Sequence, residues 1–447
     1  MRKSLRMTDP SGQSAASGPQ VSMQLDPFLI LSMWLGISLL FVNPSKDGWF
    51  EWLYLPVASG YGLSLFEAVA IFVNVVVIVA KGFVVKPAER RIILALFLVL
   101  CSRAISIVLA QESTPDQFLS LLRYSGIAVL IIGSAGLFSV RSSRTAFVVG
   151  ATIAALTEAL GGMLITLSSS GEQRGILVSE GAYVVEAFIA TLCLLVAAKR
   201  VNFVFPAGLG LVVIIGGVLA SLTRTGMILA ALSLALAYGY LAYSQRSKRY
   251  QMLLVGGGLA TLVAGLCAVA YLSLPRVGQV IEERILMAFH GEGSVLERYY
   301  LWDRALAAFL EYPITGIGSG GFARQQASLP QLFGIESPYQ YTDVEELPGV
   351  HNLVLGVASE TGLAGLSAYA VWFSIVIMLS VRALKVGRSS SEVAPIAAAI
   401  LLLALALSDF WASGSFLPSF SILAGFVLGW LRELRAAALD HSRLGFA

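Results

Sequence analysis

The chain has 447 residues, of which 57% are hydrophobic and 13% are charged, and its formal net charge is +3. Soluble proteins carry about 25% charged residues, so this composition, with a mean hydropathy of +0.80, excludes soluble domains, a disordered chain, a collagen-like chain and a disulfide scaffold. It indicates an integral membrane protein, in which Cys101, Cys193 and Cys267 lie within apolar runs and are expected to be core residues.

Residues 1–26 are polar, rich in Ser and Gly, and lack the apolar region of a signal peptide, so we expect a flexible cytoplasmic tail. The apolar stretches that follow approach the ~20 residues that cross a bilayer as a helix. They predict an all-α polytopic membrane protein of about twelve transmembrane helices, at about 28–43, 63–80, 92–110, 119–139, 145–168, 181–198, 203–221, 226–243, 251–273, 352–381, 394–411 and 416–431.

The resulting layout has five parts. Helices 1–9 occupy 27–273, a large extramembrane loop occupies 274–350, helices 10–12 occupy 351–431, and a second tail covers 432–447. The tenth helix is long enough to tilt or break near Gly362 and Gly365. Twenty of the 30 basic residues fall on one side of this layout, and cytoplasmic loops are the ones that gather Lys and Arg. Both termini are therefore predicted to be cytoplasmic.

Five ionisable residues fall in the outer halves of predicted helices, namely Glu67, Arg103, Arg123, Glu158 and Glu186. A charge at mid-bilayer costs at least ~2.5–3.5 kcal/mol and is usually kept for a site, a pathway or an internal pair. Because all five share one leaflet, they predict a polar cavity that opens outward. A buried structural Arg–Glu pair is the alternative for any one of them.

The loop at 274–350 carries ten acidic residues and five arginines. Apolar spacing predicts amphipathic helices at 276–291 and 295–313, with Pro313 ending the second. A flexible Gly-rich loop at 316–322 and an acidic, turn-rich stretch at 339–350 follow. So much charge beside a membrane favours a lid over a polar site.

Three segments resemble a known family: SLTRTG at 221–226, ERYYLWDRALAAFLEYPITGIGSGGF at 297–322 and HNLVLGVASETGLAGL at 351–366. In order and in placement on the outer side, they resemble the core of the O-antigen ligase and polymerase superfamily. The resemblance implies a bacterial membrane glycosyltransferase with a GT-C-like helical fold, which acts on glycans linked to undecaprenyl diphosphate.

Transfer from a lipid diphosphate requires cations that hold the diphosphate as it leaves, and the planar guanidinium binds phosphate in a bidentate manner. Arg224 lies at the predicted membrane boundary and Arg298 on the predicted lid helix, and the resemblance assigns both to diphosphate binding. The structural alternatives are a snorkelling arginine and a solvated one. Trp302 and Asn352 are further candidates for the cavity.

His351 begins the helix after the lid, and imidazole, with a reference pKa of ~6.5, can take a proton from an acceptor hydroxyl. The resemblance implies that it is the catalytic base of an inverting transfer; a capping histidine is the alternative. Glu360, nine residues later, falls on the opposite side of an ideal helix. It could orient His351 only through a break near Gly362, so we expect a structural role.

No metal-ligand spacing and no Rossmann-like pattern is visible, so we expect no metal, no cofactor, no nucleotide sugar and no nucleic-acid partner. The predicted function is that of an O-antigen ligase of the bacterial inner membrane, with its active site facing the periplasm. Its partners would be an undecaprenyl-diphosphate-linked glycan, a lipid A-core acceptor and membrane lipids. A polymerase on the same carrier is the alternative; a twelve-helix transporter or flippase is disfavoured because no internal repeat is visible.

Overall fold

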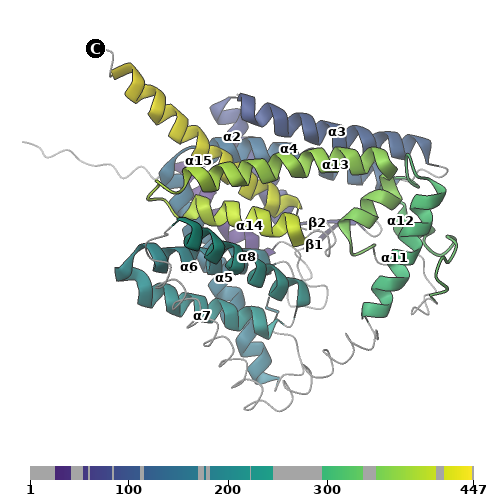
Figure 1. Ribbon diagram of the computed structural model, residues 1–447, viewed down its shortest axis with the longest axis horizontal. Helices are drawn as coiled ribbons and strands as arrows, with labels where there is room; N and C mark the ends of the chain where they lie inside the picture. The colour runs from purple at the N-terminus through teal and green to yellow at the C-terminus, as the bar shows by residue number, and fades with distance from the viewer. Residues whose placement is uncertain are drawn as a thin grey trace, which may run out of the picture.

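The computed structural model describes residues 26–41, 54–58, 61–82, 85–110, 115–169, 176–177, 182–221, 223–244, 294–335, 349–408 and 417–444. The described part is mainly helical (Figure 1). Its long helices are α1 Pro27–Ser38, α2 Leu65–Lys81, α3 Pro87–Leu109, α4 Pro115–Leu137, α5 Arg141–Ser168, α6 Tyr183–Lys199, α7 Val204–Ala220, α8 Arg224–Ser244, α11 Ser294–Glu311, α13 Leu353–Val386, α14 Ala394–Ser408 and α15 Leu417–Leu444. Shorter pieces are η1 Leu39–Phe41, η3 Val201–Phe203 and α12 Phe322–Gln325.

Helices lie at eleven of the twelve segments in which the sequence predicted a span, and the ninth, about 251–273, lies outside the described residues. Within the described chain, four helices are long and apolar enough to cross a membrane: Glu89–Leu109, Arg141–Ser168, Thr225–Ser244 and Leu353–Val386. Shorter apolar helices accompany them at Pro27–Phe41, Tyr124–Leu137, Val204–Ala220 and Ala394–Ser408. This is the architecture of a polytopic membrane protein.

One short hairpin departs from the all-helical prediction. Strands β1 Tyr54–Ala58 and β2 Tyr61–Ser64 pair antiparallel between α1 and α2, with Tyr54 opposite Ser64. Tyr and Val favour strands, and the two residues between the strands in the sequence are Ser59 and Gly60, a pair typical of turns. Neither strand forms a membrane-length apolar run, so the helix pattern of the sequence does not reveal the hairpin.

Helix α14 forms the centre of the bundle. It contacts α6, α8, α13 and α15, and most of its residues, many of them Ala and Leu, are buried. Small side chains let helix backbones approach closely where lipid supplies no hydrophobic drive for helices to associate. Helix α14 is thus an apolar centre around which the other helices pack.

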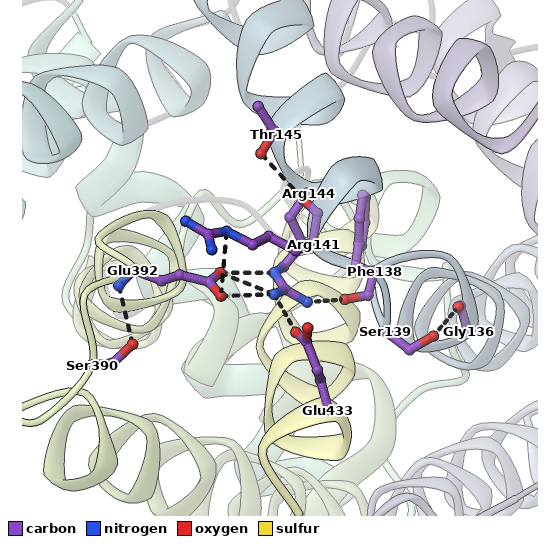
Figure 2. A network of polar contacts seen from close by, with 9 residues as sticks. All are labelled: Gly136, Phe138, Ser139, Arg141, Arg144, Thr145, Ser390, Glu392 and Glu433. Carbon is purple, nitrogen blue, oxygen red and sulfur yellow. Dashed lines mark hydrogen bonds and ion pairs between the residues drawn. The ribbon is translucent and has the colours of Figure 1, made fainter. Parts of the chain in front are cut away.

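At one end, a buried arginine joins three elements (Figure 2). Arg144 at the start of α5 forms an ion pair of 2.9 Å with Glu392, before α14, and another with Glu433 of α15. Its Nη1 also donates to the carbonyl of Phe138 at 2.8 Å. Nearby, Arg432 of α15 pairs with Glu89 in the first turn of α3. Arg144 and Arg432, which the sequence assigned to the same side of the membrane, thus lie at one end of the bundle, here called the basic end.

Helix α11, which the sequence predicted as part of a lid, lies at the other end of the described structure (Figure 1). In Figure 1, α13 runs from α11 and α12 at the right to the basic end at the left, beside α3. Helix α11 confirms the helix predicted at 295–313 and ends at Glu311, two residues before Pro313. The helix predicted at 276–291 and most of the acidic stretch lie outside the described residues. Helix α13 thus connects the basic end to the end at which its first residues meet α11.

Candidate functional site

His351 has an unusual backbone conformation. Within the described chain it is the one non-glycine residue with a positive φ, at 51°. A non-glycine residue pays a conformational cost of ~1–2 kcal/mol in the left-handed region, and such residues gather at sites where the surrounding structure holds them in place. The contacts on either side of His351 show what holds it.

On the following side, Asn352 caps α13. Its Oδ1 accepts a hydrogen bond of 3.0 Å from the backbone N–H of Leu355, and its carbonyl accepts one of 2.8 Å from Gly356. Asparagine is among the best N-cap residues because its side chain satisfies an amide left free in the first turn. The cap fixes the point at which α13 begins, two residues after His351.

On the preceding side, a side chain of α11 binds the backbone of Val350. Trp302 Nε1 donates a hydrogen bond of 3.2 Å to the carbonyl of Val350. Trp302 also packs edge to face on Tyr299, with ring centroids 5.9 Å apart. Residues four apart share a helix face, so Arg298, one turn before Trp302, lies on the side of α11 that meets His351.

The electrostatics support this placement. Burial lowers the pKa of His351 below its usual value, and the positive charge of Arg298 lowers it further. Burial raises the pKa of Glu297, the acidic neighbour, while Arg298 opposes that rise. His351 is therefore mainly neutral at pH 7 and able to accept a proton, beside a guanidinium that can bind an anion.

Eleven residues after His351, helix α13 breaks. Gly362 adopts φ 63° and ψ −158°, a conformation open to glycine, and the segment after α11 fills the interruption. Leu363 N–H donates to the carbonyl of Pro313 at 2.8 Å, and Ala364 N–H donates to that of Ile314 at 3.2 Å. The break predicted near Gly362 is confirmed.

Hydrogen bonds also run in the other direction, from N–H groups of the Gly-rich segment to carbonyls of α13. Ile317 N–H donates to the carbonyl of Ser359 at 2.9 Å, and Gly318 N–H donates to that of Glu360 at 3.1 Å. Ser106 of α3 donates to the same Glu360 carbonyl. The prediction of a flexible loop was wrong, because residues 316–322 supply the partners that the interrupted helix lacks and are almost all buried.

Arg103 of α3 is buried beside this break. Its Nη2 donates to the hydroxyl of Tyr124 at 2.8 Å, its Nε to that of Tyr369 at 3.1 Å, and its Nη1 to Ser319 of the Gly-rich segment. The guanidinium also lies 3.7 Å from the ring centroid of Tyr124 and 3.8 Å from the carboxylate of Glu360. Arg103 therefore joins α3, α4, α13 and the Gly-rich segment.

Glu360 lies on the Arg103 side of α13. The helix is regular from Leu353 to Thr361, so the break at Gly362 comes too late to turn Glu360 toward His351. Backbone N–H groups of Gly320 and Phe322 donate to its carboxylate. These are the contacts of a structural residue.

The other predicted residues lie elsewhere. Glu67 is buried in the first turn of α2. Glu158 of α5 accepts a hydrogen bond of 2.8 Å from the N–H of Leu177, and Glu186 of α6 lies close enough for the two carboxylates to interact. The backbones of Arg123 in α4 and Arg224 at the start of α8 are described, but their side chains are not.

The described contacts thus form three groups: Arg298, Trp302, His351 and Asn352; Arg103 and Glu360; and Glu158 and Glu186. Sequence reasoning missed Tyr124, Tyr369 and Ser319, the partners of Arg103. The available signal was the presence of two tyrosines inside otherwise apolar helices. Within the described residues, no group of three or more His, Cys, Asp or Glu side chains could hold a metal ion.

Comparison with known protein families gives a match over part of the chain. Residues 209–370 match the family model described as O-antigen ligase. The matched region includes α7, α8, α11, α12 and the first half of α13, and so contains Arg298, His351 and the break at Gly362. No curated protein matches the chain.

Proposed function

We propose that the chain transfers a polysaccharide from undecaprenyl diphosphate to a sugar hydroxyl of lipid A-core, because residues 209–370 match the family model described as O-antigen ligase. The observation that carries this proposal is the approach of Arg298 to His351 inside the matched region. A cation and a neutral imidazole in one site are what glycosyl transfer from a diphosphate requires.

Arg298 supplies the cation. A diphosphate gains negative charge as its bond to the sugar breaks, and a fixed positive group stabilises that charge most strongly in a water-excluded site. Arg298 is partly buried on α11, and Trp302 holds this helix against the turn before His351. Arg224, the first residue of α8 within the matched region, is proposed as the second diphosphate ligand.

His351 supplies the base. The acceptor hydroxyl attacks the anomeric carbon while the bond from that carbon to the diphosphate oxygen breaks, and undecaprenyl diphosphate leaves. His351 takes the hydroxyl proton as the new bond forms. A single displacement on the face opposite the leaving group inverts the anomeric centre. The imidazolium then loses its proton to water.

The placement in the membrane follows from the two ends of α13. Arg144, Arg432 and their partners gather at the end of the bundle away from His351. Because positively charged loops tend to remain in the cytoplasm, this arrangement supports a proposed periplasmic position of His351 in a bacterial inner membrane. A lipid-linked donor suits that side, where nucleotide sugars are absent.

The experiment that tests this function uses the purified protein in lipid nanodiscs. It is given an undecaprenyl-diphosphate-linked glycan together with lipid A-core or with a second lipid-linked glycan. We expect glycosylated lipid A-core and free undecaprenyl diphosphate, both absent for His351→Ala. A lengthened lipid-linked glycan instead would identify a polymerase, and no transfer to either acceptor would contradict the proposal.

A further inference from the structure

The segment that follows α11 is joined to the membrane helices by several backbone and side-chain hydrogen bonds. We define the clasp as residues 312–322, which run from the end of α11 through the Gly-rich segment. Its backbone exchanges four hydrogen bonds with residues 359–364 of α13. This exchange requires Gly362, whose positive φ interrupts α13 where the clasp enters.

Arg103 also contacts the clasp. It comes from α3, far from the lid in sequence, and its Nη1 donates to Ser319 at the middle of the clasp. The same guanidinium pairs with Glu360, whose backbone carbonyl and carboxylate both accept hydrogen bonds from clasp N–H groups. Tyr369 accepts from Arg103 Nε at 3.1 Å and fixes its orientation. Arg103 is thus directed into the clasp.

The clasp is continuous with α11. This helix ends at Glu311, and the clasp begins at the next residue. Arg298 lies thirteen residues before that end, which corresponds to a lever of ~20 Å at ~1.5 Å per residue. A tilt of ~10° at the clasp would move Arg298 by ~3 Å at that rise per residue, and misplacement of ~1 Å can cost ~10²-fold in rate.

We propose that Arg103 is a positioning residue, which sets the place of Arg298 and Trp302 over His351 by fixing the clasp. Arg103 is not proposed to touch substrate or His351. It acts through Ser319 and Glu360 on the hinge end of the lid helix. The role in transfer rests on the proposed function, whereas the control of α11 position does not.

The first test measures the position of α11 without using activity. In a cysteine-free background, spin labels at Leu296 on α11 and Met378 on α13, both exposed, report their separation by pulsed EPR in nanodiscs. A second pair, Leu164 on α5 and Met378, reports the bundle. Arg103→Met combined with Glu360→Gln removes both charges together, which avoids leaving one charge buried alone.

We expect the distance distribution of the 296–378 pair to broaden or shift by several ångströms in the double variant, while the 164–378 pair stays as in the wild type. An unchanged 296–378 distribution in this variant would overturn the proposal. If the 164–378 pair also changes, the bundle itself is disturbed, and Ser319→Ala decides the question. It removes only the hydroxyl between Arg103 and the clasp, and an unchanged 296–378 distribution there would overturn the proposal.

The second test uses transfer. Mispositioned Arg298 should weaken donor binding, so Ser319→Ala should raise the KM for the lipid-linked donor ~3–10-fold with a smaller change in kcat, and the double variant should raise it more. Arg141→Met at the basic end is the matched control and should leave both constants unchanged. Failure of wild-type transfer would refute the proposed function and leave the EPR result standing.

Discussion

Trp302 Nε1 donates a hydrogen bond of 3.2 Å to the carbonyl of Val350, the residue directly before His351. The bond joins the lid helix to the strained turn that carries the imidazole. Arg298 lies one turn earlier on the same helix, and its charge acts on His351. Helix α11 thus both contacts the turn that carries His351 and supplies the neighbouring cation.

Trp302→Phe keeps the ring and removes this hydrogen bond. A typical bond of this kind contributes about 1 kcal/mol, so we expect kcat/KM to fall ~5-fold, with a small loss of thermal stability. Tyr299→Phe, an exposed change one turn away on α11, is the control and should behave as wild type. Equal activities for the two variants would show that the bond to Val350 has no part in placing His351.

The pH dependence of transfer tests the pairing of Arg298 with His351. A base must be unprotonated, so activity should rise with pH through the pKa of His351, which lies below its usual value. Removing a neighbouring positive charge favours the protonated imidazole and raises its pKa. Arg298→Gln should therefore shift the acid limb of the residual kcat/KM to higher pH.

The matched control for this shift is Arg324→Gln, which changes an exposed arginine in α12. Its acid limb should coincide with that of the wild type. A limb that stays in place for Arg298→Gln, measured between about pH 5 and 8, would mean that the two side chains do not interact in the working enzyme.

The break in α13 can be tested with two glycines of the same helix. At Gly362, a methyl group would overlap the carbonyl of Ile314, and φ is 63°. Gly362→Ala should therefore disrupt the clasp, lower thermal stability and abolish most transfer. At Gly356, the nearest atoms are Val350 side-chain atoms at 3.8 Å, so Gly356→Ala should be neutral or slightly stabilising. Similar unfolding temperatures for the two variants would contradict this account of the break.

The basic end offers a test of stability alone. The side chain of Arg144 is 2% exposed and holds Glu392 and Glu433, whereas that of Arg141 is 66% exposed and lies 4.0 Å from Glu392. Breaking a buried pair by removing one partner costs about 3–5 kcal/mol, while a surface pair contributes about 0–1 kcal/mol. Thermal unfolding in detergent should show a large loss for Arg144→Met and little change for Arg141→Met.

Membrane orientation can be tested by labelling single cysteines with an impermeant maleimide in intact cells. A cysteine at Tyr299 on the lid helix should react from the periplasm. A cysteine at Ala436, in the exposed part of α15 beyond the basic end, should react only after the inner membrane is opened. The reverse pattern would place His351 in the cytoplasm and remove the basis for a lipid-linked donor.

Much of this arrangement could be predicted because its signals are local. Membrane-length apolar runs located eleven helices, Pro313 marked the end of α11, and Gly362 marked the break in α13. The hairpin at 54–64 escaped because its strands are shorter than any run that was sought.

The clasp could not be predicted because its partners are distant. Ile317 and Ser359 are 42 positions apart, and Arg103 and Ser319 are 216 apart. Glycines at 316, 318 and 320 locally indicate a flexible loop. They form a packed segment because the break in α13 at Gly362 leaves backbone groups that hydrogen-bond to it. The positive φ of His351 likewise depends on contacts from α11 that no local pattern reveals.

The most direct test of the central claim separates donor binding from chemistry at the two neighbouring residues. Binding of the lipid-linked donor and single-turnover transfer should be measured side by side for wild type, Arg298→Ala and His351→Ala in nanodiscs. We expect His351→Ala to bind donor normally and to lose ~10²–10⁴-fold in turnover, and Arg298→Ala to lose donor affinity. Loss of donor binding in His351→Ala, or full transfer by it, would contradict the assignment of His351 as the base.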